Sequence, residues 1–342
     1  MGITSKIKES YKERLSSKAA ARQRHPGTGA ERASGDLSGI ADNKRELAFA
    51  VMLALVGIAA IYPAVYYRGS SNPPELKASR NNVLNMKNWV NFTLQESQRV
   101  AHNTRIFRFK LDPRESLGIP PVSHLIVRAE VVNSRGRQEK ISRSYVPISD
   151  LRAAGYFDVL IKILPEGMMS QRIARLNLGD SLEMRGPVVE LQYKVNMKKH
   201  LGLIAGDIGI TYMLQLINAI MSNPKDNTQV SLLYENESPE DILFKEKLDK
   251  LSQSHPNFKV FYTVIIAGGE RQGGQGHVSA DMIYKALPHP SSHTLILVSG
   301  PPKLIDRVCG TKDKERYSGQ VLGLLREIGY KHEQVRKFSL AC

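Results

Sequence analysis

The sequence predicts an N-terminal membrane helix, a small β-barrel and a doubly wound parallel-sheet domain, so the fold class is α/β plus β-barrel. Residues 47–67 contain no charged side chain, and such a run is long enough to cross a bilayer as a helix. Between about residues 88 and 192, short alternating runs are separated by proline and glycine turns, a pattern typical of a small barrel. After residue 200, strand patterns alternate with helix patterns, which favours a parallel sheet.

The segment 47–67 has two further features of a single membrane span. Arg45 and Arg68 bracket it, and tyrosines gather at one end, where aromatic belts lie at the membrane surface. A buried helix of a globular domain would carry polar residues at a helical period, and this run has none. We therefore expect the lipid bilayer as a partner.

The tail at residues 1–46 is basic in its first half, and residues 25–43 are rich in glycine, serine and aspartate, which indicates a flexible linker. The first half is amphipathic and rich in serine and alanine, as mitochondrial presequences are, although Glu9 and Glu13 depart from that pattern. Residues 68–87 form a second linker. We expect a single-pass protein of a mitochondrial membrane, with the endoplasmic reticulum membrane as the alternative. The positive-inside bias leaves the tail in the matrix or cytosol, and the side that the folded body faces stays open.

The composition excludes some classes of partner. The formal net charge of the 342 residues is +15. The sequence has no zinc-ligand spacing, no aromatic RNA-binding signature and no basic helix with heptads, so nucleic acid is not expected as a partner. The basic excess suits anionic lipid head groups, an anionic dinucleotide or an acidic protein. Cys309 and Cys342 cannot form a disulfide framework and lack metal spacing, so no metal is expected.

The stretch 141–149 combines a phosphate-binding side chain with a ring-binding one. Arg143 can hold a pyrophosphate through paired hydrogen bonds. Tyr145, two residues along a predicted strand, lies on the same face and offers a flat surface for a ring system. This stretch, with Pro147, resembles the Arg-x-Tyr-Ser/Thr-Pro-x-Ser flavin motif of the NADH-cytochrome b5 reductase family, which is ferredoxin-NADP reductase-like. His124 matches the histidine of that family's Gly-Gln-His turn.

The resemblance implies a Greek-key FAD-binding barrel at residues 88–193 and an NAD-binding α/β domain at residues 194–342. The second flavin element begins with Lys162, which the resemblance implies is cofactor-binding, and continues into a loop where relatives typically read Pro-Glu-Gly-Gly-Lys-Met-Ser. Gly167, Met169 and Ser170 match this motif. The match implies that backbone N–H groups and the Ser170 hydroxyl, at a helix start, face the flavin pyrophosphate. The loop is one residue shorter here and lacks the lysine.

Two positions expected to be catalytic depart from the family pattern. Val146 stands where the family has a hydroxyl that donates toward the reactive edge of the flavin, and valine cannot donate. Losing that bond should cost about 1–3 kcal/mol if the acceptor stays unpaired, which would slow or retune the flavin without expelling it. Ser299 precedes Gly300 and Pro301, where relatives read Cys-Gly-Pro-Pro and the cysteine helps place the nicotinamide. Slower hydride transfer is the implied consequence.

The loop 206–212 resembles the family's Gly-Gly-Thr-Gly-Ile-Thr-Pro dinucleotide motif. The resemblance implies that Gly206, Gly209 and Thr211 bind NADH, because glycine lets a backbone approach a phosphate closely. Asp207 replaces the second glycine with a carboxylate that repels a pyrophosphate. It could also cap the following helix and so fill the anion site from within.

Asp241 matches the acidic residue that the family associates with a preference for NADH over NADPH. An aspartate at a helix start is also often a cap, so two interpretations stay open for this position.

The resemblance implies a membrane-anchored oxidoreductase that passes electrons from NADH through FAD to a haem protein such as cytochrome b5. Cytochrome b5 would be an acidic partner suited to a basic chain. The departures at Val146, in the shortened flavin loop, at Asp207 and at Ser299 keep a second hypothesis open. It is a degenerate, non-catalytic or weakly active flavodomain that serves membrane assembly or interaction. A reductase that uses another electron donor is a third.

Overall fold

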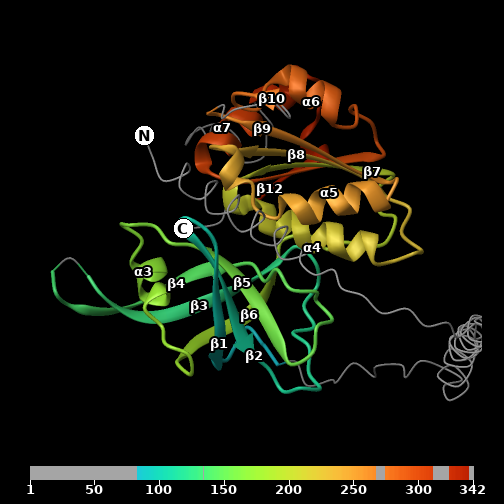
Figure 1. The fold of residues 1–342 in the computed structure, drawn as a ribbon. Helices are drawn as coiled ribbons and strands as arrows, with labels where there is room; N and C mark the ends of the chain where they lie inside the picture. Colours follow the sequence, from blue (N-terminus) through green and yellow to red (C-terminus); the bar gives the residue numbers. More distant parts are fainter. Residues whose placement is uncertain (1–82, 134, 267–273, 311–322, 339–342) are drawn as a thin grey trace, which may run out of the picture. The chain divides into compact units, whose positions relative to one another are not determined.

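The computed structural model of the chain describes residues 83–133, 135–266, 274–310 and 323–338. No helix within these ranges has the length and apolar character needed to cross a membrane. The segment 47–67 lies outside them, so the membrane span stays a prediction. The described residues form two six-stranded sheets that follow one another along the chain (Figure 1).

The first sheet is antiparallel, with the strand order β4-β3-β6-β1-β2-β5. Strand β6 returns to lie between β1 and β3, which is the long connection of a Greek key. A bridge between Pro147 and Val159 joins the chain just beyond β4 to β5, and so brings the two edges of the sheet together. The predicted barrel-like antiparallel domain is confirmed. Its elements are β1 (Val90–Ala101), β2 (Thr104–Lys110), β3 (Ser123–Val132), β4 (Gln138–Tyr145), β5 (Tyr156–Lys162), α3 (Met168–Ala174) and β6 (Ser181–Val189).

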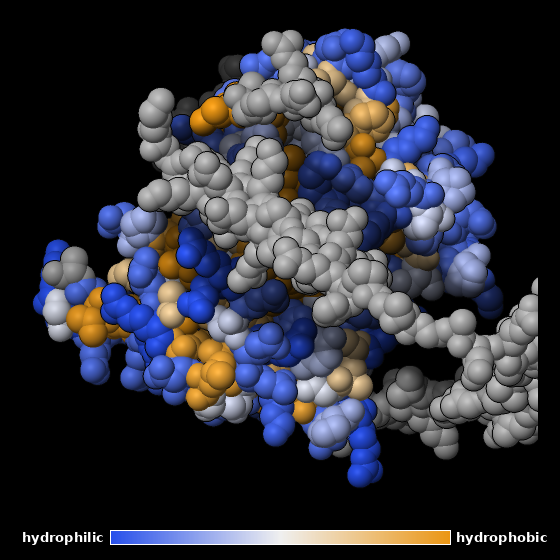
Figure 2. Space-filling model, viewed as in Figure 1, coloured by the Kyte–Doolittle hydropathy of each residue, from blue (hydrophilic) through white to orange (hydrophobic). Residues whose placement is uncertain are grey.

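Aromatic and aliphatic side chains fill the barrel. The ring of Phe157 packs edge-on against Phe92, with 5.1 Å between centroids, and stacks on Phe109 at 5.5 Å. Helix α3 adds Met169 and Ile173 to the same core. On the face drawn in Figure 2, hydrophilic side chains predominate and hydrophobic ones occur in small groups, as is usual for a folded domain in water.

The second sheet is parallel, with the order β10-β9-β8-β7-β11-β12. Its central strands β7 and β11 are almost wholly buried because helices cover both faces. Helices α4 and α5 lie on one face and α6, α7 and α8 on the other (Figure 1). The elements are β7 (His200–Gly206), η1 (Asp207–Gly209), α4 (Ile210–Met221), β8 (Gln229–Asn236), η2 (Pro239–Asp241), α5 (Lys245–Ser254), β9 (Phe258–Val264), β10 (Gly274–Gln275), α6 (Ala280–Ala286), β11 (Thr294–Ser299), α7 (Pro302–Cys309), α8 (Gly323–Glu327), η3 (His332–Gln334) and β12 (Val335–Phe338).

The strand order reverses between β7 and β11. The chain runs outward from β7 through β8 and β9 to β10, and then returns to the other side of β7 as β11 and β12. In such sheets a crevice forms beyond the carboxyl ends of the strands that flank the reversal. Gly206 ends β7 and Ser299 ends β11, so the structure brings these two predicted site residues to the reversal point.

Helix α4 is tied to the barrel by the side chain of Gln215. Its Oε1 accepts a hydrogen bond from the backbone N–H of Ser123 at 2.9 Å. Its Nε2 donates to the carbonyl oxygens of Ser123 at 3.1 Å and Pro147 at 2.8 Å. The amide is buried and uses both ends on barrel backbone. One side chain therefore sets the position of α4 against two loops of the barrel.

Local sequence features set the bounds of two elements near the site. Strand β4 ends at Tyr145, because Pro147, two residues on, has no N–H to continue a ladder. Helix α5 starts at Lys245, after the single turn of η2 that contains Asp241. Phe244 adopts a left-handed conformation with φ of 58° and separates that turn from α5.

We expect Gln215→Leu to lower the free energy of unfolding by about 3 kcal/mol, because it removes three hydrogen bonds and leaves buried backbone groups of the barrel unpaired. Urea unfolding of the full chain measures this. Gln98→Leu, at an exposed position on β1, is the matched control and should change stability by less than about 0.5 kcal/mol. Equal effects of the two substitutions would contradict the role given to Gln215.

Candidate functional site

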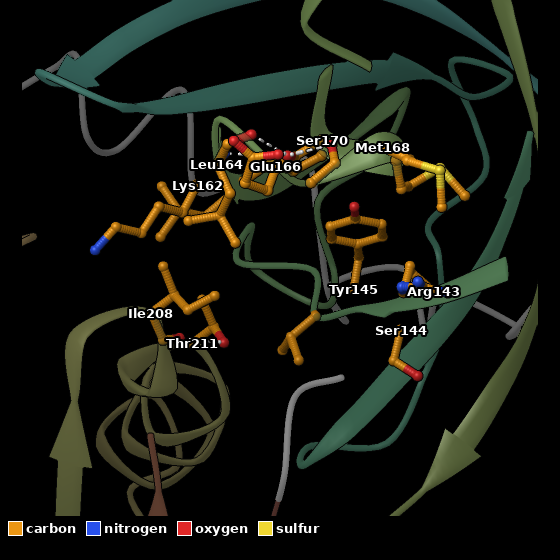
Figure 3. A pocket seen from close by; sticks show the side chains of 15 residues that line it. Arg143, Ser144, Tyr145, Lys162, Leu164, Glu166, Met168, Ser170, Ile208 and Thr211 are labelled. Atoms are coloured by element: carbon orange, nitrogen blue, oxygen red, sulfur yellow. Dashed lines mark hydrogen bonds between the residues drawn. The ribbon is translucent and has the colours of Figure 1, made fainter. Parts of the chain in front are cut away.

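A pocket lies between the barrel and the start of α4 (Figure 3). We call it the first pocket. Strand β4 and its extension form one wall, the end of β5 and the loop to α3 form another, and η1 with α4 closes it. Eight of the predicted site residues line it. The lining residues are Arg143, Ser144, Tyr145, Val146, Leu160, Ile161, Lys162, Leu164, Glu166, Gly167, Met168, Met169, Ser170, Ile208 and Thr211.

Arg143 and Tyr145 lie together at this pocket, as their spacing predicts. They are alternate residues of β4 and pair with Val127 and Leu125 of β3. Figure 3 shows the tyrosine ring at the pocket with the guanidinium group beside it. The one hydrogen bond recorded for the guanidinium among the described residues runs from an Nη to the carbonyl oxygen of Ser142, at 2.9 Å. A guanidinium has five N–H groups, so donors remain for an anionic ligand.

The loop before α3 uses its hydroxyl group internally. Ser170 Oγ donates to the carbonyl oxygen of Gly167 at 2.9 Å and accepts from the N–H of Leu164 at 3.1 Å. A Cβ atom at Gly167 would lie 2.5 Å from that oxygen, so glycine is needed for the loop to close. Met169 packs into the barrel core. The structure thus gives Ser170 and Met169 the task of shaping the loop, which was predicted to face a phosphate.

The wall at Val146 is apolar. Its side chain is 2% exposed and lines the pocket together with Leu160 and Ile208. The hydroxyl of Thr211 lies nearby but donates to the carbonyl oxygen of Ile208 at 2.9 Å. This wall can contact the edge of a flat ring through dispersion, and Val146 itself supplies no hydrogen bond.

A second pocket lies beyond the carboxyl ends of β7 and β8. Four predicted site residues line it: Lys162, Gly206, Asp241 and Pro301. Lys162 lines both pockets, since its side chain reaches from the end of β5 toward the second sheet. The full lining is His102, Asn103, Lys162, Gly206, Asp207, Glu235, Asn236, Glu237, Asp241, Ile265 and Pro301.

Asp207 pairs with Lys162 across the two sheets. The ammonium nitrogen lies 2.5 Å from Oδ2 of the carboxylate, and about a quarter of each side chain is exposed. Asp207 has a left-handed backbone with φ of 49°, a conformation that aspartate tolerates better than most residues. The prediction that Asp207 caps α4 is wrong, since neither η1 nor α4 has a side-chain cap. The carboxylate instead neutralises the cation that an incoming phosphate would use.

Asp241 forms part of a helix cap. Its Oδ2 accepts hydrogen bonds from the backbone N–H of Ser238 at 3.1 Å and from the Ser238 hydroxyl at 2.8 Å. The other carboxylate oxygen lies 3.5 Å from Nδ1 of His102 on the barrel. The capping interpretation of Asp241 is therefore confirmed, and the side chain still lines the second pocket.

Three predicted glycines are closely packed at the ends of β7 and β11, two against backbone and one against a side chain. A Cβ atom at Gly209 would lie 2.3 Å from the carbonyl oxygen of Ser299, and one at Gly300 would lie 3.0 Å from the N–H nitrogen of Gly206. One at Gly206 would lie 2.5 Å from the side chain of Leu304. Close packing of the two strand ends accounts for these glycines, which were predicted to leave room for a phosphate.

Ser299 is completely buried, and its hydroxyl has no hydrogen-bond partner among the described residues. Asn236, at the end of β8, is 3% exposed; its amide group lies close enough to the hydroxyl of Tyr234 to donate to it, and its amide oxygen has no partner in the described part of the chain. A buried polar group without a partner costs about 1–3 kcal/mol. Ser299 ends β11 at the strand-order reversal, and Asn236 ends β8, the next strand beyond β7, so this edge of the sheet carries buried polar atoms.

The sequence analysis missed a buried ion pair beside the second pocket. Glu235 is 6% exposed, and both of its carboxylate oxygens lie 2.8 Å from an Nη of Arg307. It also accepts from the N–H of Val278 at 2.6 Å. The signal was the one charged residue near the end of the strand run from 229 to 236. The partner, 72 residues away, carries no such signal.

His124 and Pro147 line neither pocket. His124 Nδ1 lies 2.9 Å from the hydroxyl of Tyr212 on α4 and 3.3 Å from a carboxylate oxygen of Glu190. Burial lowers the pKa of His124, and the charge of Glu190 opposes this in part. Together with the Gln215 contact to Pro147, this places both predicted residues in the contact between the barrel and α4.

Comparisons with known proteins identify related domains. The oxidoreductase FAD-binding domain family matches residues 91–193, and the oxidoreductase NAD-binding domain family matches residues 203–310. An Arabidopsis thaliana protein described as NADH-cytochrome b5 reductase-like is 51% identical over 257 residues, which are 75% of this chain and 78% of that protein. NADH-cytochrome b5 reductase 2 of Aspergillus oryzae is 35% identical, with 80% and 85% covered.

A solved structure has the same architecture. The cytochrome b5 reductase domain of Ulva prolifera nitrate reductase superimposes with a TM-score of 0.67 at 29% identity, covering 75% of this chain and 99% of that one. The comparisons show that the cofactors are FAD and NADH.

The described residues fit these two cofactors. In the first pocket, the donors of Arg143 and the ring of Tyr145 suit a flavin with its pyrophosphate. In the second pocket, the buried amide oxygen of Asn236 has no partner among the described residues, which suits a polar dinucleotide with hydroxyl and amide donors. The carboxylates that line this pocket, and the contact between Asp207 and its lysine Lys162, oppose an anionic ligand.

We expect folding stability to fall as the pH is lowered through the range between the lowered pKa of His124 and its ordinary value near 6.5. In that range the unfolded chain binds a proton that the buried imidazole does not. Urea unfolding between about pH 5 and 7 should show a shallower pH dependence for His124→Gln. His200, whose pKa burial also lowers, gives an independent comparison: His200→Gln should flatten the profile separately. An unchanged profile for His124→Gln contradicts the assignment.

Proposed function

Because the chain belongs to the NADH-cytochrome b5 reductase family, we propose that it is a membrane-anchored FAD-dependent oxidoreductase that passes electrons from NADH through FAD to a haem protein such as cytochrome b5. The observation that carries this proposal is the pair of adjoining pockets that share Lys162. One has the cationic and aromatic side chains that a flavin requires. The other lies at the strand-order reversal of a parallel sheet, where dinucleotides bind.

Different residues of the first pocket would bind different parts of FAD. Arg143 would bind the pyrophosphate through paired hydrogen bonds, and Tyr145 would pack against a ring. Val146, with its apolar neighbours, would exclude water from one edge of the ring and leave that edge without a hydrogen bond from this position. Bound FAD supplies the chemistry of accepting a hydride and releasing electrons one at a time.

The residues of the second pocket would hold NADH. Gly206 and Pro301 would form its floor, and Asn236 would supply a hydrogen-bond acceptor. Ser299 lies fully buried beneath this edge, so its hydroxyl can act on a ligand only after the strand end shifts. Asp241, fixed by Ser238, would present its carboxylate to the ligand in a set orientation.

A haem protein is the electron acceptor that we favour. Both relatives described above carry NADH-cytochrome b5 reductase in their names. The net charge of +15 favours association with an acidic protein and speeds diffusional encounter at low salt. Reduction of purified cytochrome b5 that slows as salt is added would support this partner.

We also propose that residues 47–67 anchor the chain in a mitochondrial membrane, with the endoplasmic reticulum as the alternative. Support comes from the uncharged run and the basic tail that precedes it. In fractionated cells, the full chain should stay with mitochondrial membranes after alkaline carbonate extraction. A variant that lacks residues 47–67 should be released. Release of the full chain would refute the anchor.

The alternative of a non-catalytic module, raised by the departures from the family pattern, has one structural observation in its favour. Asp207 already pairs with Lys162, the lysine that lines the second pocket. Such a pair is what we would expect in a protein that no longer binds NADH. The hypothesis predicts a flavin that NADH does not reduce, or no flavin at all.

An anaerobic absorption spectrum of the purified full chain, before and after NADH is added, tests the enzyme directly. We expect a flavin spectrum that NADH bleaches. Arg143→Ala should lower the flavin content at least about tenfold, because a bidentate charged contact is worth roughly 1.5–3 kcal/mol. Arg152→Ala is the matched control, since Arg152 is exposed and pairs locally with Asp150. A flavin that stays unbleached, or equal flavin loss in both variants, would contradict the proposal.

A further inference from the structure

Lys162 is the one lysine or arginine that lines the second pocket within the described part of the chain. Four carboxylates line the same pocket: Asp207, Glu235, Glu237 and Asp241. Arg307 holds Glu235 from behind, and Ser238 holds Asp241. An anionic ligand that enters this pocket therefore finds a single strong side-chain cation, and Asp207 already binds it.

We propose that Asp207 is an internal competitor for the dinucleotide phosphate, so that the Lys162–Asp207 pair acts as a latch which NADH must open. This inference rests on the proposed function, because it concerns the donor site of that reaction. In the free protein the Asp207 carboxylate lies against the Lys162 ammonium. When a dinucleotide binds, a phosphate oxygen takes the place of the carboxylate oxygen at Lys162.

The backbone at Asp207 is built to stay in place while the side chain changes partner. The hydroxyl of Tyr234 donates to the carbonyl oxygen of Asp207 at 3.1 Å, and Tyr234 is itself fully buried. Gly209 fixes the next turn against the backbone of Ser299. Opening the latch therefore requires rotation of one short side chain, and the loop keeps its shape.

The latch should set the affinity for the donor. A partly exposed ion pair is worth about 1 kcal/mol at most, which corresponds to a factor of about five in affinity. Asp207 lines the second pocket and is absent from the lining of the first. Removing the Asp207 charge should therefore change the affinity for the dinucleotide. Flavin retention, which depends on other residues, should not change.

The test measures the binding of ADP-ribose, which carries the pyrophosphate and lacks the nicotinamide, to the purified full chain by calorimetry. We expect Asp207→Asn to tighten binding about fivefold. Asparagine has nearly the same shape and tolerates the left-handed backbone, so the substitution removes the charge alone. Asp281→Asn is the matched control. It breaks the exposed pair with Lys285 on α6, and the affinity should be unchanged.

A double-mutant cycle separates the latch from simple charge repulsion. Lys162→Met should weaken ADP-ribose binding, and adding Asp207→Asn to it should give no further gain, because the competition for Lys162 is gone. An equal gain in both backgrounds would overturn the latch in favour of long-range repulsion. No gain from Asp207→Asn in the natural background would overturn it as well.

The outcome is independent of the reductase reaction. Calorimetry with ADP-ribose requires no electron transfer, so it reports on the latch even if NADH fails to reduce the flavin. A chain whose flavin NADH does not bleach would refute the proposed function. A chain that NADH bleaches, with identical ADP-ribose affinities for the natural protein and Asp207→Asn, would refute only the latch.

Discussion

The side-chain amide of Gln215 is the contact on which both pockets depend. It joins the middle of α4 to the backbone of two barrel loops, and the residues that precede it on the same helix and turn form the shared wall of the two pockets. Ile208 and Thr211 line the first pocket, and Asp207 lines the second. A shift of α4 against the barrel would therefore change both pockets at once. A neutral amide suits this position, because it satisfies buried donors and acceptors without bringing a charge into the contact.

Charge is distributed unevenly around this shared wall. Arg143 serves the first pocket with donors to spare, and the second pocket is lined by carboxylates with Lys162 between them. This arrangement favours retention of an anionic flavin over capture of an anionic donor. Such a difference suits an enzyme that keeps one cofactor bound and exchanges the other at each turnover. The pair formed by Lys162 and Asp207 couples the two sites, because the same lysine borders both.

Local patterns in the sequence predicted the parts of the site that lie within one element. The period of two along β4 placed Arg143 and Tyr145 together, and the alternation of strands and helices predicted a parallel sheet in which Gly206 and Gly300 lie at strand ends. Contacts between elements could not be predicted in this way. Lys162 and Asp207 are 45 residues apart, and no local pattern shows that two sheets bring them together.

The same limit explains the predictions that the structure revised. From the sequence, Asp207 at a helix start was interpreted as a possible cap. In the structure its carboxylate pairs with Lys162 of the other sheet, and α4 has no side-chain cap. His124 was matched to a flavin motif, and its imidazole instead meets a tyrosine of α4. In both cases a residue with a local interpretation found a partner from a distant part of the chain.

The distribution of unpaired polar atoms favours an enzyme over a fold kept for assembly. Where Asp207 departs from the family pattern, the structure compensates for the change with a lysine. At Ser299 it does not compensate: within the described residues, the buried hydroxyl at the end of β11 has no partner, and neither has the amide oxygen of Asn236 at the end of β8. Each costs about 1–3 kcal/mol of stability, and native proteins keep such groups chiefly where a ligand uses them. A module freed from catalysis would gain stability from apolar residues at both positions. That both polar groups persist at one sheet edge, beside the second pocket, is the physical argument that this edge still binds a donor.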